Sequence, residues 1–363
     1  LLVIACPCAL VIATPVTVVS GLASAARRGI LIKGGIYLED ARKLKVIALD
    51  KTGTITEGKP KLVATEILDQ TVSEKVILEW AGSLAALSNH PVSKAISTAL
   101  APSATVVDHF MALPGRGVQG RIGNQDLILG NHRLIEERKL CGPAIEARLV
   151  EHEAQGRTMT LLANESGVLA IFAVADTIKP HAREAISTLH ALGVKAVMLS
   201  GDNQATAQAV AAQANVDDAR GNLLPDDKLK AIEALQKEFG PTAMTGDGIN
   251  DAPALARADI GIAMGAAGTD TAMEAADIVI MNDDLRRIPE AIRLSRTTHR
   301  VLWQNIILAL GIKAIFLVLA LLGSATMWMA VFADMGASLL VVSNGLRLLR
   351  LGQPDDQPTK VHG

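Results

Sequence analysis

The chain has 363 residues, a net charge of −2 at pH 7 and 50% hydrophobic residues, and its mean hydropathy of +0.31 is high for a soluble protein. This length allows two or more domains, and the near-neutral charge gives no indication of nucleic-acid binding. Three cysteines are too few for a disulfide framework, which favours a reducing compartment for the polar part of the chain.

Three long apolar stretches stand out. Residues 1–26 carry no charged side chain, residues 306–322 carry only Lys313, and residues 327–346 carry only Asp334. A membrane helix needs about 20 such residues, so each stretch predicts a transmembrane helix in contact with lipid. The first has no basic start and is too long for a signal peptide.

Basic residues flank these stretches on one side. They follow the first stretch, precede the second and follow the third: Arg27, Arg28, Arg293, Arg296, Arg300, Arg347 and Arg350. By the positive-inside rule, residues 27–305 and the C-terminus are expected in the cytoplasm of a bacterial inner-membrane protein. Because the first span begins at Leu1 with no methionine before it, we expect the chain to be the C-terminal part of a longer protein.

Three apolar runs between the first two spans end in loops rich in Asp and Gly. They read KVIALDKTGT (45–54), KAVMLSGDN (195–203) and TAMTGDGIND (242–251), and helical stretches such as 181–193 and 203–215 alternate with them. Buried parallel strands alternating with helices indicate a doubly wound α/β sheet. Ligands of such sheets bind beyond the carboxyl ends of the strands.

The stretch between about 60 and 172 has a different pattern, with hairpin-like strands, helices and the Gly-rich LPGRGVQGRIGN. It predicts an α+β domain inserted after the first strand. The expected domains are therefore a membrane helix and stalk (1–43), a discontinuous α/β domain (44–59 and 173–297), the inserted domain (60–172), two membrane helices (298–350) and a disordered tail (351–363).

The strand-end loops hold the residues that phosphate chemistry needs. Asp50 is a candidate nucleophile that would form an aspartyl-phosphate, and Lys228 is a cation for the transferred group. Asp247 is expected to hold Mg²⁺ together with Asp50. Backbone approach at Gly246 and Gly248, and the side chains of Asn250 and Asp251, would complete the site. One Asp-Gly loop is usually an ordinary turn, but three in this order are not.

Together the motifs DKTGT (50–54), SGDN (200–203), LLPDDK (223–228) and TGDGINDAP (245–253) resemble the phosphorylation domain of P-type cation-pumping ATPases, whose fold is haloacid dehalogenase-like. DTIKP (176–180) matches the family's returning strand and hinge, and Ser200 replaces the family's usual Thr. The resemblance implies that Asp50 is phosphorylated, that Asp247 and the Thr52 carbonyl bind Mg²⁺, and that phosphate is surrounded by Lys51, Thr54, Gly201, Asp202 and Lys228.

The inserted domain resembles the family's nucleotide-binding domain. SNHP (88–91) is similar to the Ser-x-His-Pro motif of the heavy-metal branch, which implies that His90 contacts the adenine of ATP. Other nucleotide contacts implied are Gly115, Gly117, Gly130 and Asn131. On its own, His90 would more often be a surface histidine. Ala85 stands where the family usually has Glu.

The first membrane span contains Cys6 and Cys8 on either side of Pro7. A proline inside a helix removes a hydrogen bond and kinks it, which would turn both thiols toward one cavity. Cysteines in apolar runs are usually inert. However, Lys313 and Asp334 are charges inside adjacent antiparallel spans, and such residues normally pair and mark ion pathways. A purely structural pair is the alternative.

Two thiolates with one carboxylate suit a divalent borderline cation such as Zn²⁺ or Cd²⁺, whereas Cu⁺ prefers all-soft ligands. The residues around Lys313 and Asp334 resemble the zinc/cadmium/lead-exporting branch. That resemblance implies that Cys6, Cys8 and Asp334 bind the exported Zn²⁺, Cd²⁺ or Pb²⁺, with Lys313 as the counter-ion.

The expected function is therefore ATP-driven export of divalent heavy metals. No Thr-Gly-Glu motif of the family's actuator domain is present, so the missing N-terminal part of the same pump is the expected partner. The alternatives are a copper(I)-exporting pump, a soluble phosphatase of the same fold, which the three spans oppose, and a truncated membrane protein that only binds metal or ATP.

Overall fold

The computed structural model describes residues 8–100, 105–247, 251–265, 270–324 and 326–350. The chain divides into two compact units, one of residues 1–47, 187–195 and 229–363 and the other of residues 48–186 and 196–228. The predicted tail and the kink at Pro7 lie outside the described residues.

A seven-stranded sheet has the strand order β1-β13-β12-β11-β2-β9-β10. Strands β11, β12 and β13 pair in parallel, as do β9 and β10, whereas β1 pairs antiparallel with β13. The strands are β1 (Ile30–Ile32), β2 (Val46–Asp50), β9 (Lys195–Leu199), β10 (Asp218–Arg220), β11 (Thr242–Gly246), β12 (Ile260–Met264) and β13 (Ile278–Ile280). All five residues of β2, β11 and β12 are buried, as the uninterrupted apolar runs predict.

Helices and short turns alternate with these strands, which confirms the predicted α/β class. They are α3 (Gly35–Asp40), η1 (Ala41–Lys43), η2 (Lys51–Ile55), α8 (Ala182–Ala191), α9 (Gln204–Ala214), α10 (Pro225–Phe239), α11 (Ala252–Arg257) and α12 (Asp270–Ala275). Asn203 caps α9, since its side chain accepts a 2.7 Å hydrogen bond from the Thr206 amide.

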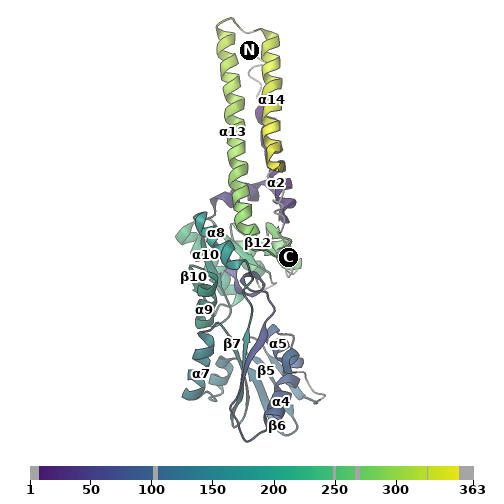
Figure 1. Ribbon diagram of the computed structural model, residues 1–363, viewed down its shortest axis with the longest axis vertical. Helices are drawn as coiled ribbons and strands as arrows, with labels where there is room; N and C mark the ends of the chain where they lie inside the picture. The colour runs from purple at the N-terminus through teal and green to yellow at the C-terminus, as the bar shows by residue number, and fades with distance from the viewer. Residues whose placement is uncertain (1–7, 101–104, 248–250, 266–269, 325, 351–363) are drawn as a thin grey trace, which may run out of the picture. The chain divides into compact units, whose positions relative to one another are not determined.

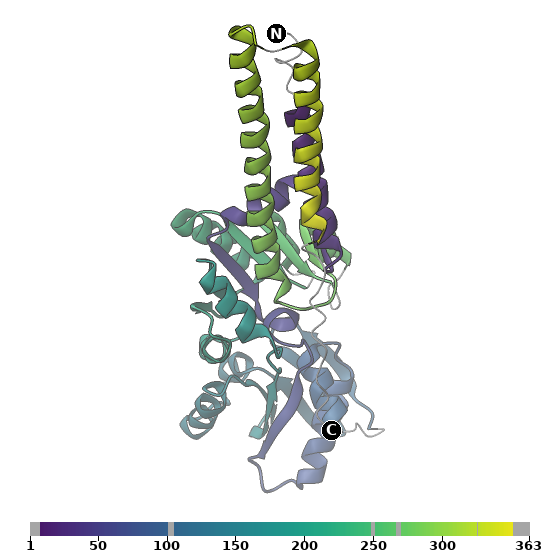
Figure 2. The same ribbon diagram turned by 45° about the horizontal axis from the view of Figure 1, so that its top comes forward.

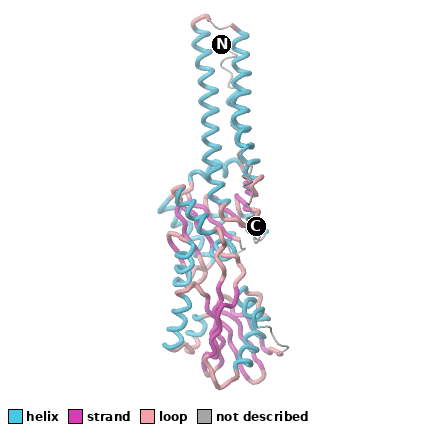
Figure 3. Tube along the Cα trace, viewed as in Figure 1, coloured by secondary structure: helices cyan, strands magenta, loops and turns pink. Residues whose placement is uncertain are grey.

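A six-stranded antiparallel sheet has the order β3-β8-β7-β6-β5-β4. Its strands are β3 (Lys61–Ile67), β4 (Asp108–Leu113), β5 (Gly117–Ile122), β6 (Gln125–Gly130), β7 (Thr158–Asn164) and β8 (Gly167–Ala175). The helices around it are α4 (Glu74–Ala86), α5 (Pro91–Leu100), α6 (His132–Glu137) and α7 (Pro143–Glu153), with α7 on one side of the sheet and α4 and α5 on the other (Figures 1 and 3).

Strand β8 of this sheet is buried on both faces. Phe172 and Val174 pack into one core with residues of α4 and α5. Ile171 and Ala173 point the other way, into a core that includes Leu149 of α7. Because side chains alternate along a strand, helices on both faces explain why β8 reads as a continuous apolar run.

Three helices are long and apolar enough to cross a membrane: α2 (Cys8–Ala26), α13 (Arg287–Leu321) and α14 (Met327–Arg350). They lie side by side (Figures 1 and 2) and share a core of Ala9, Ala13, Ala309, Ala337 and Val341. Small residues let membrane helices approach closely, whereas large apolar side chains such as Phe332 stay exposed. The chain is thus an integral membrane protein.

Helix α13 runs through the expected domain boundary at 297/298 without a break. Its base is fixed by a 2.7 Å ion pair between Glu290 and Arg28, beyond the end of α2, and by a 2.8 Å hydrogen bond from Arg296 to the carbonyl of Leu192. The domain boundaries stay predictions.

Candidate functional site

Asp50 ends β2 and is only 6% exposed. The Thr52 amide donates a 3.0 Å hydrogen bond to its Oδ2, and the Lys228 ammonium, in the first turn of α10, donates to its Oδ1. The predicted nucleophile and the predicted cation therefore lie in direct contact, and these two donors fix the orientation of the carboxylate.

Lys51, which follows Asp50 in the sequence, forms a second ion pair with Asp202. The Lys51 side chain is also buried. The loop that carries Asp202 is shaped by Ser200, whose hydroxyl accepts a 3.1 Å hydrogen bond from the Asp202 amide. Ser200 thus keeps a hydroxyl at the position where the resembled family usually has Thr, and uses it within the loop. A Cβ on Gly201 would meet the Leu223 carbonyl at 3.4 Å, so the backbone passes close there.

Thr54 has a fully buried side chain, and its hydroxyl has no hydrogen-bond partner among the described residues. A buried hydroxyl without a partner is costly. Such an atom is expected where a polar ligand completes the site, and Thr54 is one of the residues predicted to contact phosphate.

Residues 176–180 (DTIKP) contact residues 53–59, which follow Asp50 in the sequence. The Asp176 carboxylate accepts hydrogen bonds from the Thr56 hydroxyl at 2.6 Å and from the amides of Gly58 and Lys59 at 3.1 Å. Lys179 donates a 2.5 Å hydrogen bond to the carbonyl of Gly53, whose φ of 71° suits glycine. These four hydrogen bonds therefore hold DTIKP (176–180) against residues 53–59. The sequence alone did not reveal these contacts.

Asp247 and Asp251 belong to the loop after β11. Asp251 is 3% exposed, and a Cβ on Gly246 would lie 2.8 Å from its side chain, so only glycine fits there. Gly248 and Asn250 lie outside the described residues.

Four of the predicted nucleotide contacts lie together where β5 begins and β6 ends. Gly117 pairs with Gly130, and a Cβ on Gly117 would lie 2.3 Å from the Leu129 carbonyl. The Asn131 side chain caps α6 and also donates a 3.0 Å hydrogen bond to the Gly115 carbonyl. Close backbone packing thus explains Gly117 without a ligand, whereas Gly115 faces open space and owes its glycine to a φ of 69°.

His90 precedes α5, and its Nδ1 accepts a 3.3 Å hydrogen bond from the Val92 amide. The residue as a whole is exposed, although partial burial of its ring lowers the pKa of His90. Because Nδ1 accepts, the neutral ring carries its proton on Nε2. Ala85, in contrast, is fully buried in α4. A side chain at position 85 therefore packs in the core of this sheet.

Lys313 of α13 and Asp334 of α14 form the ion pair that was expected inside the membrane, with 2.9 Å between Nζ and Oδ1. Both side chains are largely buried, at 16% and 21% exposed. Cys6 lies outside the described residues, and of Cys8 only the position at the start of α2 is described. The pair is thus the described part of the predicted metal site.

A polar contact among the same helices was missed by the sequence analysis. The amide of Asn305, which is fully buried, donates to Thr17 Oγ1 at 3.1 Å, and its oxygen accepts from Asn344 at 2.8 Å. The contact joins α2, α13 and α14. Asn305 and Asn344 lie near the ends of two apolar spans, and polar residues in such places could have indicated a contact between the helices.

The chain belongs to the haloacid dehalogenase-like hydrolases, because that family's model matches residues 44–259. This agrees with the predicted α/β fold, in which Asp50, the predicted nucleophile, ends β2 and contacts Lys228.

The matched proteins narrow the resemblance. The chain is 42% identical over 96% of its length to a probable cadmium-transporting ATPase of Alkalihalophilus pseudofirmus, and it covers 50% of that protein. It is also 42% identical over 96% of its length to a copper-exporting P-type ATPase of Bacillus subtilis, of which it covers 44%. The crystal structure of a zinc-transporting PIB-type ATPase in the E2·Pi state superimposes with a TM-score of 0.77 at 43% identity, covering 96% of this chain and 57% of that one.

These matches confirm the predicted resemblance to heavy-metal P-type ATPases and the predicted fold. The chain spans about half the length of the curated relatives it matches. Overall identity does not separate the cadmium from the copper relative, so the choice of metal depends on individual residues.

Proposed function

We propose that the protein exports divalent heavy-metal ions, Zn²⁺, Cd²⁺ or Pb²⁺, in a reaction driven by ATP. The observation that carries this proposal is the Lys313–Asp334 ion pair between two membrane helices. A carboxylate is a hard ligand, which suits a borderline divalent ion better than Cu⁺. The metal is the substrate of this site, with Cys6, Cys8 and Asp334 as its ligands and Lys313 as the counter-ion.

In the proposed reaction, one oxygen of the Asp50 carboxylate attacks the γ-phosphorus of ATP. A bond forms between that oxygen and phosphorus, the bond to the β,γ-bridging oxygen breaks, and ADP leaves. Lys228, whose ammonium contacts Asp50, offsets the negative charge of the transferred group. The Thr54 hydroxyl, which has no hydrogen-bond partner in the described part of the chain, would donate to a phosphate oxygen. Lys51, Gly201, Asp202, Asn250 and Asp251 complete the proposed phosphate site.

Hard oxygen donors suit Mg²⁺, and Asp50, Asp247 and the Thr52 carbonyl are donors of that kind. We propose that these residues would hold it, and the ion would neutralise charge on the phosphoryl group. For ATP itself, the proposed contacts are His90, Gly115, Gly117, Gly130 and Asn131. Gly115 faces open space and His90 is an exposed residue, which supports a role for both in contacting a ligand.

The basic residues at the ends of the spans support a cytoplasmic location for residues 27–305 and for the C-terminus. With that orientation, ATP reaches Asp50 from the cytoplasm, and the metal ion is carried out of the cytoplasm. The chain spans about half the length of its relatives. We therefore propose that it pumps metal together with the part of such a pump that this sequence does not contain.

The test is metal-stimulated ATP hydrolysis by that protein. We expect stimulation by Zn²⁺ or Cd²⁺, loss of that stimulation in Asp334→Ala, and unchanged nucleotide binding in the variant. Ser338→Ala, one turn further along α14, is the matched control and should keep the stimulation. Stimulation by Cu⁺ but by neither divalent ion would instead support the copper(I) pump.

A further inference from the structure

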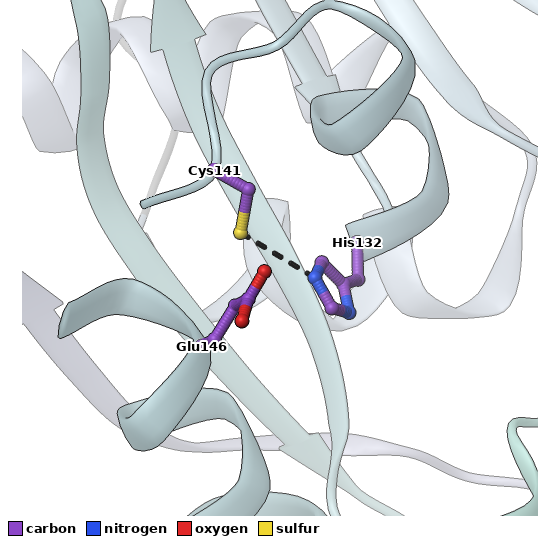
Figure 4. Close-up of side chains that lie close together, drawn as sticks. All are labelled: His132, Cys141 and Glu146. Atoms are coloured by element: carbon purple, nitrogen blue, oxygen red, sulfur yellow. Dashed lines mark hydrogen bonds between the residues drawn. The ribbon is translucent and has the colours of Figure 1, made fainter. Parts of the chain in front are cut away.

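A cluster of metal-ligating side chains lies outside both sites described above. His132, Cys141 and Glu146 each offer a ligand atom, and these atoms all lie within 4.8 Å of one another. Figure 4 shows the three side chains converging from the start of α6, the α6–α7 connection and the first turn of α7. None of these residues belongs to the phosphate, nucleotide or membrane sets.

The backbone fixes this arrangement. Lys139 adopts the left-handed conformation with a φ of 57°, and the Leu140 amide donates a 3.1 Å hydrogen bond back to the Ile135 carbonyl. The chain therefore reverses tightly after α6. Cys141 and Ile145 then pack against the core that contains Ile135 and Leu149, which holds the thiol toward the ring of His132.

The distances fit coordination. His132 Nε2 and Cys141 Sγ are 3.4 Å apart. Zinc bonds of about 2.0–2.1 Å to nitrogen and 2.3 Å to sulfur at a tetrahedral angle place those two atoms about 3.6 Å apart. Glu136 Oε1 lies a further 3.9 Å from His132 Nε2, so another carboxylate is within reach of a fourth position.

The burial of the cluster also suits an exchangeable ion. His132 and Cys141 are half-buried and Glu146 is exposed, so an ion can enter from solvent and lose only part of its hydration.

We propose that His132, Cys141 and Glu146 form a second metal site that binds a borderline divalent cation, Zn²⁺ or Cd²⁺, outside the membrane. Thiolate, imidazole and carboxylate together select these ions over Mg²⁺ or Ca²⁺. The proposal stands on the geometry of this cluster and does not require that the protein transports metal.

The test uses the full 363-residue chain in detergent with Cys6→Ser and Cys8→Ser. Because the chain has three cysteines, Cys141 is then its only thiol. Titration with Cd²⁺ should produce an ultraviolet cadmium–thiolate charge-transfer band that saturates at one ion per chain. Adding Cys141→Ser should abolish the band.

His132→Ala and Glu146→Gln should each raise the dissociation constant for Cd²⁺ roughly tenfold or more, since even indirect partners of metal ligands are worth that much. The matched controls are His109→Ala on β4 and Glu151→Gln on α7, which should leave the titration unchanged. Absence of the band, or a band that keeps its affinity in His132→Ala and Glu146→Gln, would overturn the proposal. Neither result depends on ATP hydrolysis, so failure here leaves the proposed pump function intact.

Discussion

At the scale of single residues, the Asp50 carboxylate is almost closed to solvent and accepts a hydrogen bond on each of its two oxygens. Its Oδ1 accepts from Lys228 and its Oδ2 from the Thr52 amide. Asn has the same shape as Asp but no negative charge, so it keeps the packing and removes the nucleophile. We expect Asp50→Asn to abolish the acid-stable phosphoenzyme formed from radiolabelled ATP.

The control for this prediction is Asp69→Asn, which changes a loop carboxylate that accepts hydrogen bonds from the amide and the hydroxyl of the nearby Thr71. It should label as the unmodified protein does. Persistent labelling in Asp50→Asn would assign the phosphorylated residue elsewhere.

Thr54 gives a residue-level prediction in which stability and activity move in opposite directions. Val matches Thr in shape and removes the buried hydroxyl that has no partner. We expect Thr54→Val to unfold at the same temperature or a higher one, while the rate of phosphoenzyme formation falls roughly 10–100-fold, because a hydrogen bond to a charged group contributes about 1.5–3 kcal/mol. Thr54→Ser, which keeps the hydroxyl, should retain most of the rate. An unchanged rate in Thr54→Val would mean that the hydroxyl does not contact phosphate.

At the scale of elements, Glu66 joins β3 to α7. His152 donates from Nε2 to Glu66 at 2.9 Å, Arg148 donates to it at 2.6 Å, and Arg157 donates to the other ring nitrogen of His152 at 2.9 Å. The hydrogen bond from His152, then that from Arg148, lowers the pKa of Glu66. A carboxyl with a lowered pKa stabilises the fold above its unfolded value of about 4.3, and that stabilisation is lost as the pH falls through the folded value.

We therefore expect Glu66→Gln to speed hydrogen exchange in peptides from β3 and α7 at pH 7. The difference from the unmodified protein should shrink as the pH falls below about 4.3. Measuring both proteins at each pH cancels the intrinsic pH dependence of exchange, and Glu151→Gln on the exposed face of α7 is the control. A difference that stays constant down to the acid end would contradict an ionised role for Glu66.

The Lys313–Asp334 pair links α13 and α14, so its two charges are best tested together. Lys313→Met or Asp334→Met alone leaves one charge in an apolar span, at a cost of about 2.5–3.5 kcal/mol. We expect each single variant to accumulate less in membranes, and the double variant to recover while still lacking metal-stimulated ATP hydrolysis. Size-exclusion chromatography of detergent extracts measures the first effect. A double variant that accumulates no better than the single ones would show that the charges do not offset each other.

Sequence patterns predicted helices and strands better than they predicted which side chains form hydrogen bonds with one another. The buried strand β2 and the Asp at its end were predictable because a parallel strand is one uninterrupted apolar run. The contacts that fix these elements were not. Glu66 and His152 are 86 residues apart, and Thr56 and Asp176 are 120 apart. A single polar residue does not show which of many distant donors it will meet.

At the scale of the whole molecule, α13 is the element whose continuity matters most to the proposed pump. It holds Arg296 near its base and Lys313 in the apolar part, 17 residues or about 25 Å further along. Proline at position 310, whose side chain is half exposed, would break a hydrogen bond between these two points at a cost of about 3 kcal/mol.

We expect Leu310→Pro to keep ATP binding and to lose metal-stimulated hydrolysis, whereas Leu310→Ala, which removes the same side chain without breaking the helix, should keep both. Equilibrium nucleotide binding and phosphate release with and without Zn²⁺ measure the two effects. Full metal stimulation in the proline variant would mean that α13 does not need to be continuous.

The Thr17–Asn305–Asn344 contact also constrains how the protein is made. Asn305 and Asn344 bond each other across α13 and α14, but the NH₂ group of Asn305 lacks its Thr17 acceptor until α2 joins them. An unsatisfied polar group in hydrocarbon is costly, so the two-helix arrangement carries a penalty until then. Thr17 and Asn305 are separated by 288 residues, and every strand of both sheets lies between them in the sequence. Closing so long a loop is slow. We therefore expect this contact among α2, α13 and α14 to form late, because it cannot close before α13 has been synthesised and joined to a helix 288 residues earlier in the chain.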